Sequence, residues 1–360
     1  MGKKILEFCL SPDLGGLELC VLDYFYAFKE RGECYIAVAP ESKLDNYFED
    51  RCKIEIQRNK FFPFIPALKI AKFIDEKGID TIHFHWTRDI ATVVLAKILS
   101  KRKPQVIQSR HMTMTRFKDD FYHNWLYKNI DIIHAVTYQV KEQLLKFIPQ
   151  KVRPKVEVVY LGVSEKRVLE SRVNELEEQY DFKNSFVVGI VGRIEEAKGQ
   201  YIVIEALEKL KEFQIKLLVV GDSMDSEYIL ALKSKVEALG LVEKVLFTGF
   251  TKEVDAHMKL CDVTVLATPK ETFGLVVIES MLNKTPVIAT ANGGPLEIIE
   301  DNVDGFLFDR SAEVLSQKIL KLYNDKEYKD SVSLKAYEKV KKDFDKESQM
   351  NKMYGVINEG

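Results

Sequence analysis

Short apolar runs alternate with longer amphipathic stretches along almost the whole chain. The apolar runs have the length of buried strands, and the stretches between them repeat apolar residues at the helical period. In the first half the expected strands are residues 4–10, 34–40, 80–85, 104–111, 131–137 and 155–162. Strand–helix alternation of this kind predicts α/β structure with a parallel sheet and helices on both of its faces.

The pattern pauses at residues 164–184, which are highly charged and lack a strand pattern, and then restarts. In the second half the expected strands are residues 185–193, 216–222, 244–250, 263–269, 286–291 and 305–308. We therefore predict two Rossmann-like domains, at residues 1–170 and 171–340. The last helix is expected over about residues 328–360. Its end, residues 341–360, is expected to pack back on the first domain, because no further strand follows it.

Composition narrows the class of protein. The chain of 360 residues is 46% hydrophobic and 30% charged, which is typical of a soluble globular protein. The net charge of −2 gives no indication of a nucleic-acid partner. Residues 51–160, however, contain 21 Lys and Arg against 10 Asp and Glu, which predicts a basic face on the first domain.

Three further features indicate a cytoplasmic protein. The five cysteines form no C-x-x-C pair, which is typical of free thiols in a reducing compartment. The N-terminus does not resemble a signal peptide, and no apolar run reaches the 18 residues of a membrane span.

Ligands of open α/β sheets bind beyond the carboxyl ends of the strands, so the residues that follow each strand are the first candidates. Gly15 and Gly16 follow the first strand and open a helix, where a glycine pair lets a ligand approach the backbone. An ordinary tight turn is the alternative. The pair is not part of a G-x-G-x-x-G motif, and no acidic residue ends the next strand, so a nicotinamide dinucleotide site is not expected.

Histidines lie on two of the expected strands. His111 ends one strand, and this position favours a functional role over a core role. His83 and His85 alternate along another strand and therefore share one of its faces. No third ligand stands at a suitable spacing. We expect these two histidines to be structural or to line an acceptor site, and we expect no metal site.

Arg193 and Lys198 lie in the loop between a strand and the helix expected over residues 200–210. Near a helix N-terminus, Arg can bind phosphate through two hydrogen bonds and Lys acts as a point charge. A solvated turn is the alternative.

Glu271 and Glu279 lie eight positions apart in the segment ETFGLVVIE. If helical, eight residues span about 12 Å, which is too far for the two carboxylates to act together on one bond. They can instead hold the two ends of an elongated polar ligand. The N–H groups of Phe273, Gly274 and Leu275, at the start of the expected helix, suit a diphosphate. A nucleotide-sugar has this layout.

Together these motifs resemble the GT4 family of retaining glycosyltransferases. E-x-F-G-x-x-x-x-E is the most specific motif, and one departure is Met112 after His111, where the family often has glycine. The matching segments are GGLE (15–18), RH (110–111), GRIEEAKG (192–199), GD (221–222), VLFTGF (245–250), ETFGLVVIE (271–279), GGPLE (293–297) and DGFLF (304–308). They are spread over most of the chain.

The resemblance implies a GT-B fold, with two Rossmann-like domains and an active site in the cleft between them. The first domain would bind the acceptor and the second the nucleotide-sugar donor. The implied catalytic residues are His111, Arg193, Lys198 and Glu271. The implied donor-binding residues are Gly15, Gly16, Thr272, Phe273, Gly274, Leu275 and Glu279.

The implied reaction moves a sugar from a nucleotide-sugar, with a UDP-sugar favoured, to a glycan or lipid-linked acceptor. The anomeric configuration would be retained. Such an enzyme would serve the assembly of surface polysaccharide or glycoconjugates. No D-x-D motif ends a strand, so we expect neither a catalytic metal nor any other cofactor.

Other functions stay open at this point. A nucleotide-sugar epimerase or a phosphorylase has the same fold, although a phosphorylase needs a pyridoxal-type lysine site that the sequence does not reveal. A non-catalytic nucleotide-sugar-binding subunit is the third alternative. The presence of Arg193, Lys198, Glu271 and Glu279 counts against it.

Two aromatic stretches of the first domain also have two interpretations. Residues 58–72 mix cations with Phe61, Phe62, Phe64 and Ile65, as in a segment that lies on an anionic membrane at the inner face. Ordinary core packing of a helix is the alternative. Residues 112–131, which include Trp125, either line a site for the acceptor or pack as an ordinary helix.

Overall fold

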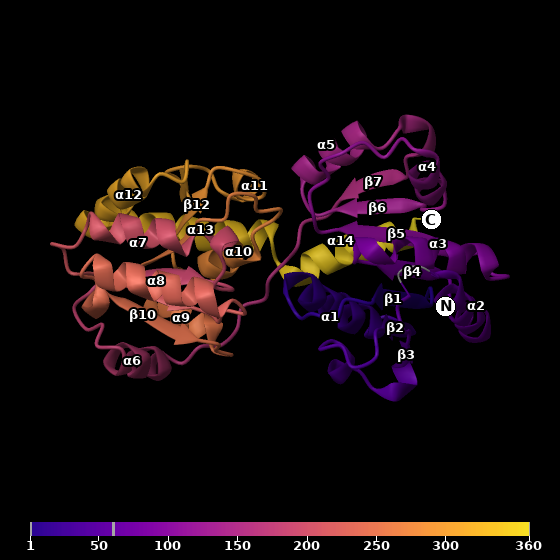
Figure 1. Cartoon of the computed structure of the whole chain (residues 1–360), viewed down its shortest axis with the longest axis horizontal. Coiled ribbons are helices and arrows are strands. Elements are labelled where there is room, and N and C mark those ends of the chain that lie inside the picture. Colours follow the sequence, from indigo (N-terminus) through magenta and orange to yellow (C-terminus); the bar gives the residue numbers. More distant parts are fainter. Residues whose placement is uncertain (1, 60–61, 360) are drawn as a thin grey trace. The chain divides into compact units, whose positions relative to one another are not determined.

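The computed structural model describes residues 2–59 and 62–359 and divides the chain into two compact units (Figure 1). The first unit is Met1–Leu161 together with Glu347–Gly360, and the second is Gly162–Lys346. The division falls just before the charged stretch at which the sequence pattern pauses. Each unit is an α/β domain built on one parallel sheet.

In the described part of the first unit, the sheet has seven strands in the order β3-β2-β1-β4-β5-β6-β7, and every neighbouring pair is parallel. The strands are β1 (Ile5–Cys9), β2 (Cys34–Val38), β3 (Lys53–Glu55), β4 (Thr81–Phe84), β5 (Gln105–Arg110), β6 (Ile132–Ala135) and β7 (Lys155–Val158). The sequence pattern predicted all of these except β3. That strand has three residues at the sheet edge and buries only Ile54, so it carries almost no hydrophobic signal.

The helices of the first unit cover its sheet. They are α1 (Gly16–Lys29), α2 (Phe64–Lys77), α3 (Ile90–Leu99), α4 (Phe121–Lys128), α5 (Tyr138–Phe147) and α14 (Lys346–Asn358). Helix α14 joins this unit through the Tyr354 ring, which lies 5.9 Å from that of Phe28, and through the carbonyl of Ile357, which accepts a hydrogen bond from Lys3. The end of the chain therefore packs on the domain with which the chain begins.

In the described part of the second unit, the sheet has six parallel strands in the order β10-β9-β8-β11-β12-β13. The strands are β8 (Phe186–Val191), β9 (Ile215–Val220), β10 (Val245–Gly249), β11 (Val263–Leu266), β12 (Val287–Thr290) and β13 (Phe306–Phe308). The helices are α6 (Glu170–Gln179), α7 (Gln200–Glu208), α8 (Ser226–Ala238), α9 (Val254–Leu260), α10 (Leu275–Leu282), α11 (Pro295–Ile298), α12 (Ala312–Asn324) and α13 (Lys326–Asp343). All the strands expected in this half are present.

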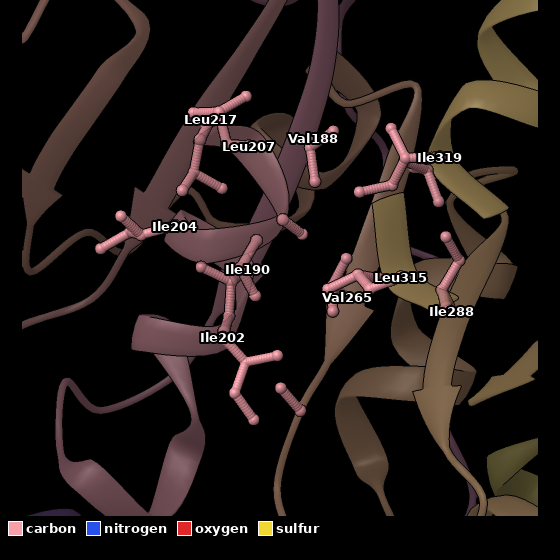
Figure 2. Close-up of a cluster of buried hydrophobic side chains, with 14 of the residues drawn as sticks. Val188, Ile190, Ile202, Ile204, Leu207, Leu217, Val265, Ile288, Leu315 and Ile319 are labelled. Atoms are coloured by element: carbon pink, nitrogen blue, oxygen red, sulfur yellow. The ribbon is translucent and has the colours of Figure 1, made fainter. Parts of the chain in front are cut away.

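The core of the second unit lies on both faces of its sheet. On one face, α7 and α12 pack their aliphatic side chains against alternate residues of β8, β9, β11 and β12. Figure 2 shows this cluster, with labels on Val188, Ile190, Ile202, Ile204, Leu207, Leu217, Val265, Ile288, Leu315 and Ile319. On the other face, α6 and α9 cover Val187, Leu218 and Val220. Burial on both faces explains why these strands are almost continuously apolar.

The prediction of one long final helix over residues 328–360 is wrong, because the structure has two helices there. Helix α13 ends at Asp343 and α14 begins at Lys346. Between them, Phe344 accepts a hydrogen bond from the amide of Val163, and the amide of Lys346 donates to the carbonyl of Val163. This pairing with a distant backbone segment replaces helical hydrogen bonds and interrupts the helix.

Asp89 is a buried acid near the carboxyl edge of the first sheet. One of its carboxylate oxygens accepts a hydrogen bond from the amide of Leu10 at 2.9 Å. The other has no hydrogen-bond partner among the described residues. Burial raises the pKa of Asp89 to about 7, although the charge of Arg58 opposes this rise. The folded protein therefore holds this proton up to a much higher pH than the unfolded chain.

We predict that Asp89→Asn stabilises the protein increasingly as the pH rises. The unfolded chain releases the Asp89 proton near pH 4 and the folded state near pH 7, so wild-type stability falls between these values. The asparagine variant lacks this loss. Its advantage in the free energy of unfolding should grow by about 2 kcal/mol between pH 5 and pH 8, measured by urea unfolding.

Asp75→Asn is the matched control, because Asp75 has the opposite environment. Its carboxylate accepts hydrogen bonds from the Ser100 hydroxyl and the amides of Lys101 and Arg102, and these lower its pKa. This variant should be less stable than the wild type at neutral pH, and the deficit should shrink as the pH falls. A pH-independent effect of Asp89→Asn would contradict the prediction.

Candidate active site

The site residues of the second unit lie at the carboxyl edge of its sheet, where two loops approach unusually closely. A Cβ atom added to Gly221, after β9, would lie 2.0 Å from the carbonyl oxygen of Gly192, after β8. The amide of Ile194 donates to the carbonyl of Asp222 at 2.9 Å. Only a glycine at position 221 permits this approach, which fixes the start of the loop that carries Arg193 and Lys198.

Lys198 ends a short 3₁₀ turn, Glu196–Lys198, directly before α7. Gly199 follows in the left-handed region, and its α-carbon packs so tightly against Ala267 at the end of β11 that an added Cβ would lie 2.7 Å from the Ala267 carbonyl oxygen. This contact places Lys198 beside the loop that follows β11. Its ammonium nitrogen lies 3.6 Å from a carboxylate oxygen of Glu271. The structure therefore brings two of the predicted catalytic residues together.

Glu271 lies in the loop before α10 and not on the helix. Helix α10 begins at Leu275, with Gly274 as its N-cap at a φ of 99°. The expectation of a helix from residue 273 is therefore wrong at its start, because the left-handed turn at Gly274 redirects the chain. The amides of Leu275 and the residue after it begin the helix and have no acceptor within it. Glu279 lies one turn further on, half-buried.

A second loop supports this turn. The amide of Gly294, after β12, donates to the carbonyl of Glu271 at 3.0 Å. An added Cβ on Gly294 would lie 2.0 Å from the carbonyl oxygen of Phe273. Phe273 is buried, and its ring packs 6.1 Å from that of Phe344. Residues 271–274 are thus fixed from both sides, with Thr272 half-buried among them.

Arg193 is placed differently from Lys198. Its side chain is 65% exposed, and its guanidinium lies 3.8 Å from the carboxylate of Glu195. Its carbonyl accepts a hydrogen bond from Gln200 at the start of α7, so the backbone of the loop is fixed while the cation extends into solvent. The guanidinium is therefore accessible to an anion from solvent.

Thr268 is a residue of this edge that the sequence did not single out. It lies just after β11 and is buried, and its hydroxyl has no hydrogen-bond partner among the described residues. A buried hydroxyl without a partner is costly and is often explained by a ligand or a water molecule. The only sequence signal was its position at a strand end.

Gly15, Gly16 and His111 belong to the first unit. Gly15 caps α1, and its amide donates to the buried carboxylate of Glu18 at 2.8 Å. The expectation that the glycine pair opens a helix is confirmed. His111 is half-buried after β5, and its Nε2 lies 3.1 Å from Nδ1 of His85.

His83 and His85 are buried, and the structure supplies a third partner that the sequence pattern did not indicate. Glu7 of β1 lies opposite His83 in the parallel register, and its two oxygens lie 2.8 Å from His83 Nδ1 and 2.7 Å from His85 Nε2. The three ligand atoms lie within 4.8 Å of one another. The distances are those of ordinary hydrogen bonds, so a hydrogen-bonded cluster accounts for the arrangement. The missed signal was a glutamate inside an apolar strand, KILEFCL.

Two Rossmann-like units, with glycines, a lysine and carboxylates gathered at a strand edge, define an enzyme of the GT-B class. The chain matches the family model described as Glycosyl transferases group 1 over residues 143–339 and the model described as Glycosyltransferase Family 4 over residues 14–167. It belongs to this family of glycosyltransferases. The predicted fold class and the resemblance to GT4 are confirmed.

Relatives with assigned activities match most of the chain. N-acetyl-alpha-D-glucosaminyl L-malate synthase of Bacillus anthracis is 26% identical over 350 residues, which cover 92% of this chain and 91% of the relative. N-acetylgalactosamine-N,N'-diacetylbacillosaminyl-diphospho-undecaprenol 4-alpha-N-acetylgalactosaminyltransferase of Campylobacter jejuni subsp. jejuni is 27% identical over 299 residues, which cover 78% of each chain.

Solved structures show the same fold. HepE of Anabaena in complex with UDP superposes with a TM-score of 0.87 at 22% identity and covers 99% of this chain and 100% of its own. The complex of the same protein with UDP-glucose has a TM-score of 0.84 at 22% identity, covering 98% of each chain. At this identity the likeness establishes the fold alone.

Proposed function

We propose that this glycosyltransferase moves a sugar from a UDP-sugar to a glycan or lipid-linked acceptor, with retention of configuration. The observation that carries the proposal is the Lys198–Glu271 pair beside the Gly274-capped helix α10, at the carboxyl edge of the second sheet. A cation, a carboxylate and a helix N-terminus in this order suit the diphosphate and the sugar of one donor. The UDP complexes of HepE support uridine as the base.

In this proposal, Lys198 and Arg193 neutralise the diphosphate as it leaves. The 3.6 Å separation of Lys198 from Glu271 is longer than a hydrogen bond, so the ammonium group can turn to a phosphate oxygen without losing a strong partner. Cations of this kind stabilise charge that appears only as the sugar–phosphate bond breaks. Glu271 accepts hydrogen bonds from hydroxyls of the transferred sugar.

The remaining predicted residues bind the donor. Glu279, one turn into α10, accepts hydrogen bonds from the ribose hydroxyls, while the backbone of residues 272–275 lies along the diphosphate. Gly16 permits close approach of the donor to the first unit's backbone, and His111 contacts the sugar near its reacting carbon. The cleft between the domains, in which the family would place the donor, stays a prediction.

Retention follows from attack on the face that the diphosphate leaves. The bond between the anomeric carbon and the phosphate oxygen breaks, and the acceptor oxygen bonds to the same face of that carbon. The acceptor proton passes to a phosphate oxygen of the departing UDP. Glu271, in the loop before α10, is placed to bind hydroxyls, and the sequence offers no obvious second carboxylate for a double displacement.

The names of the relatives support the acceptor class. One acts on a diphospho-undecaprenol-linked sugar and another on malate, so the family accommodates lipid-linked and small acceptors. We favour a lipid-linked or glycan acceptor in surface polysaccharide or glycoconjugate assembly. The basic first domain suits the anionic diphosphate of such a lipid.

A nucleotide-release screen over a panel of nucleotide-sugars tests this function. UDP release that depends on both a UDP-sugar and an acceptor supports transfer. Conversion of the donor into its epimer without an acceptor would instead establish an epimerase. Binding of UDP-sugars without any turnover would establish a binding subunit.

We predict that Glu279→Gln, Glu271→Gln and Lys198→Ala change different kinetic constants. Loss of the charged ribose contact should raise the donor KM about ten-fold or more, since such a hydrogen bond contributes roughly 1.5–3 kcal/mol. The other two changes should lower kcat, by roughly ten-fold for Glu271 and a hundred-fold for Lys198, because their contacts strengthen in the transition state. Steady-state kinetics and UDP titration calorimetry separate these effects.

Lys270→Ala is the matched control, since Lys270 is an exposed lysine directly before Glu271. It should change neither constant by more than about two-fold. Unchanged donor affinity in Glu279→Gln, or unchanged turnover in Lys198→Ala, would show that these residues do not hold the two parts of the donor.

We predict that transfer needs no divalent metal. The chain lacks a D-x-D motif after a strand, and Lys198 and Arg193 supply the positive charge that a metal would otherwise provide. Turnover should persist after exhaustive chelation and dialysis. Activity that disappears on chelation and returns with manganese or magnesium would contradict this.

We also propose that the first domain contacts an anionic membrane through one face of α2. This helix buries Ala67, Ile70 and Ile74, yet its outward side is also apolar. The outward apolar residues of the helix are Phe64, Ile65 and Leu68, which are 51%, 70% and 45% exposed, and Phe62, two residues before the helix, is 67% exposed. They are accompanied on this helix by the exposed cations Lys69 and Lys72. Lys60 and Phe61, which belong to the same predicted stretch, lie outside the described residues.

Such a surface suits the interface of an anionic bilayer, where apolar side chains insert and lysines meet headgroups. Within the described residues, no helix has both the length and the hydropathy of a membrane span. We propose a peripheral contact, at the inner face of the membrane of a cytoplasmic enzyme.

We predict that the double change Phe64→Ser and Ile65→Ser reduces binding to phosphatidylglycerol vesicles at least five-fold. Wild-type binding should also weaken with salt and be much lower on phosphatidylcholine, because charge contributes. Co-sedimentation measures both. Leu230→Ser in α8, which is 62% exposed, is the control and should have no effect. Equal binding by the wild type and the double variant would refute the contact.

A further inference from the structure

A continuous chain of hydrogen bonds crosses the first sheet and ends at His111. From the far end, Nε2 of His134 lies 2.7 Å from the carbonyl oxygen of Val159, and its Nδ1 lies 2.6 Å from the hydroxyl of Ser109. The same hydroxyl lies 2.7 Å from Nε2 of His83. His83 and His85 then hold the two oxygens of Glu7, and His85 contacts His111 at 3.1 Å.

The parallel register builds this chain. Glu7 pairs with His83 across β1 and β4, and Ser109 pairs with His134 across β5 and β6, so side chains of the same face meet. Apart from His111, the side chains are almost completely buried. The ring of Tyr24, from α1, covers the cluster at 5.1 Å from His83 and 5.4 Å from His85. Water therefore does not compete for these hydrogen bonds.

The direction of every hydrogen bond follows from the carbonyl of Val159, because a carbonyl can only accept. His134 must donate from Nε2, so its Nδ1 is an acceptor and takes the Ser109 hydroxyl proton. The Ser109 oxygen in turn accepts from Nε2–H of His83. If His83 is neutral, its Nδ1 bears no hydrogen, so Glu7 must supply the hydrogen between them.

A count of hydrogens leads to the same result. Six hydrogen bonds link Val159, His134, Ser109, His83, Glu7, His85 and His111. Four neutral imidazoles and one hydroxyl supply five hydrogens, so one further proton is held beside Glu7 and cancels its charge. Each of these polar hydrogens then lies in one of the six hydrogen bonds. The single nitrogen-bound hydrogen of His111 therefore lies on Nε2.

The environment favours this neutral state. Burial raises the pKa of Glu7, and it lowers the pKa of His83, His85 and His111 to about 3 and that of His134 to about 4. The directions of these shifts favour a protonated acid and neutral imidazoles, which are the forms that the six hydrogen bonds require. Charged groups inside a dry sheet face would be far more costly.

We propose that Glu7 is a positioning residue that, as a protonated acid, fixes His111 in its Nε2–H tautomer. The second nitrogen of His111, Nδ1, is thereby left as a hydrogen-bond acceptor for a hydroxyl of the donor sugar. The proposal rests on the proposed function, because it takes His111 as the group that contacts the sugar. The tautomer itself is a property of the free protein.

Glutamine is the informative substitution at position 7. Its amide offers one donor and one acceptor in the places of the acid, so Glu7→Gln can donate to His83 and accept from His85. Glu7→Gln should keep the Nε2–H tautomer of His111. Its kcat with UDP-glucose should lie within about three-fold of the wild-type value. Glu7→Leu removes both partners and lets His85 and His111 exchange donor and acceptor roles. It should lower kcat roughly ten-fold with a smaller change in KM.

Long-range ¹H–¹⁵N spectra of histidine-labelled protein measure the tautomer directly, with each histidine assigned by its own substitution. In the wild type, His111 should show a protonated Nε2 and a bare Nδ1, and it should stay neutral through the ordinary histidine range near pH 6.5. Glu7→Gln should give the same spectrum, and Glu7→Leu should shift His111 toward the Nδ1–H form. If Glu7→Leu fails to fold, His85→Phe breaks the same link while keeping an aromatic ring.

Thr81→Val is the matched control, because Thr81 is a buried polar residue of β4 outside the chain of hydrogen bonds. It should leave the His111 spectrum and the turnover of UDP-glucose unchanged. A protonated Nδ1 on wild-type His111, or a Glu7→Gln variant that behaves like Glu7→Leu, would overturn the proposal. If His111 shows the expected tautomer but the protein binds no UDP-sugar, the proposed function is overturned instead. The proposed contact of His111 with the sugar is then overturned as well.

Discussion

Parallel pairing of every neighbouring strand is the constraint on which the rest of the structure depends. It gathers all carboxyl ends at one edge of each sheet, so that Lys198, after one strand, lies beside Glu271, after another. It also requires both faces of each sheet to be covered, which explains why a helix follows nearly every strand. The same register aligns Glu7 with His83 inside the first sheet. The site and the buried hydrogen-bonded chain are both products of strand pairing.

Close backbone contact gives the edge of the second sheet its rigidity. Gly221 and Gly294 each lie where an added Cβ would be 2.0 Å from a carbonyl oxygen of a neighbouring loop. These contacts fix the loops that begin at residue 192 and residue 271, while the long side chain of Arg193 stays exposed. A fixed backbone beside an exposed cation suits the diphosphate binding that we propose, since preorganised dipoles need no rearrangement.

Both domains bury polar side chains beside their apolar ones. One core cluster of the second unit is apolar, and Figure 2 shows aliphatic members of it. The first unit buries a glutamate, three histidines and a serine together against its sheet. Such groups are costly to bury unless each has a hydrogen-bond partner. The six hydrogen bonds satisfy this condition, and they connect the interior of the domain to His111.

The sequence by itself determined the alternation of strand and helix and the two-domain α/β fold, because local periodicity does not depend on distant contacts. It also determined the family, because the segment ETFGLVVIE is a contiguous motif. It did not determine the break at Phe344, which depends on hydrogen bonds to Val163. Nor did it reveal that Glu7 meets His83, which lies 76 residues away. Periodicity tells which face of a strand is buried, whereas the register between strands decides which buried side chains meet. Only the tertiary structure fixes that register.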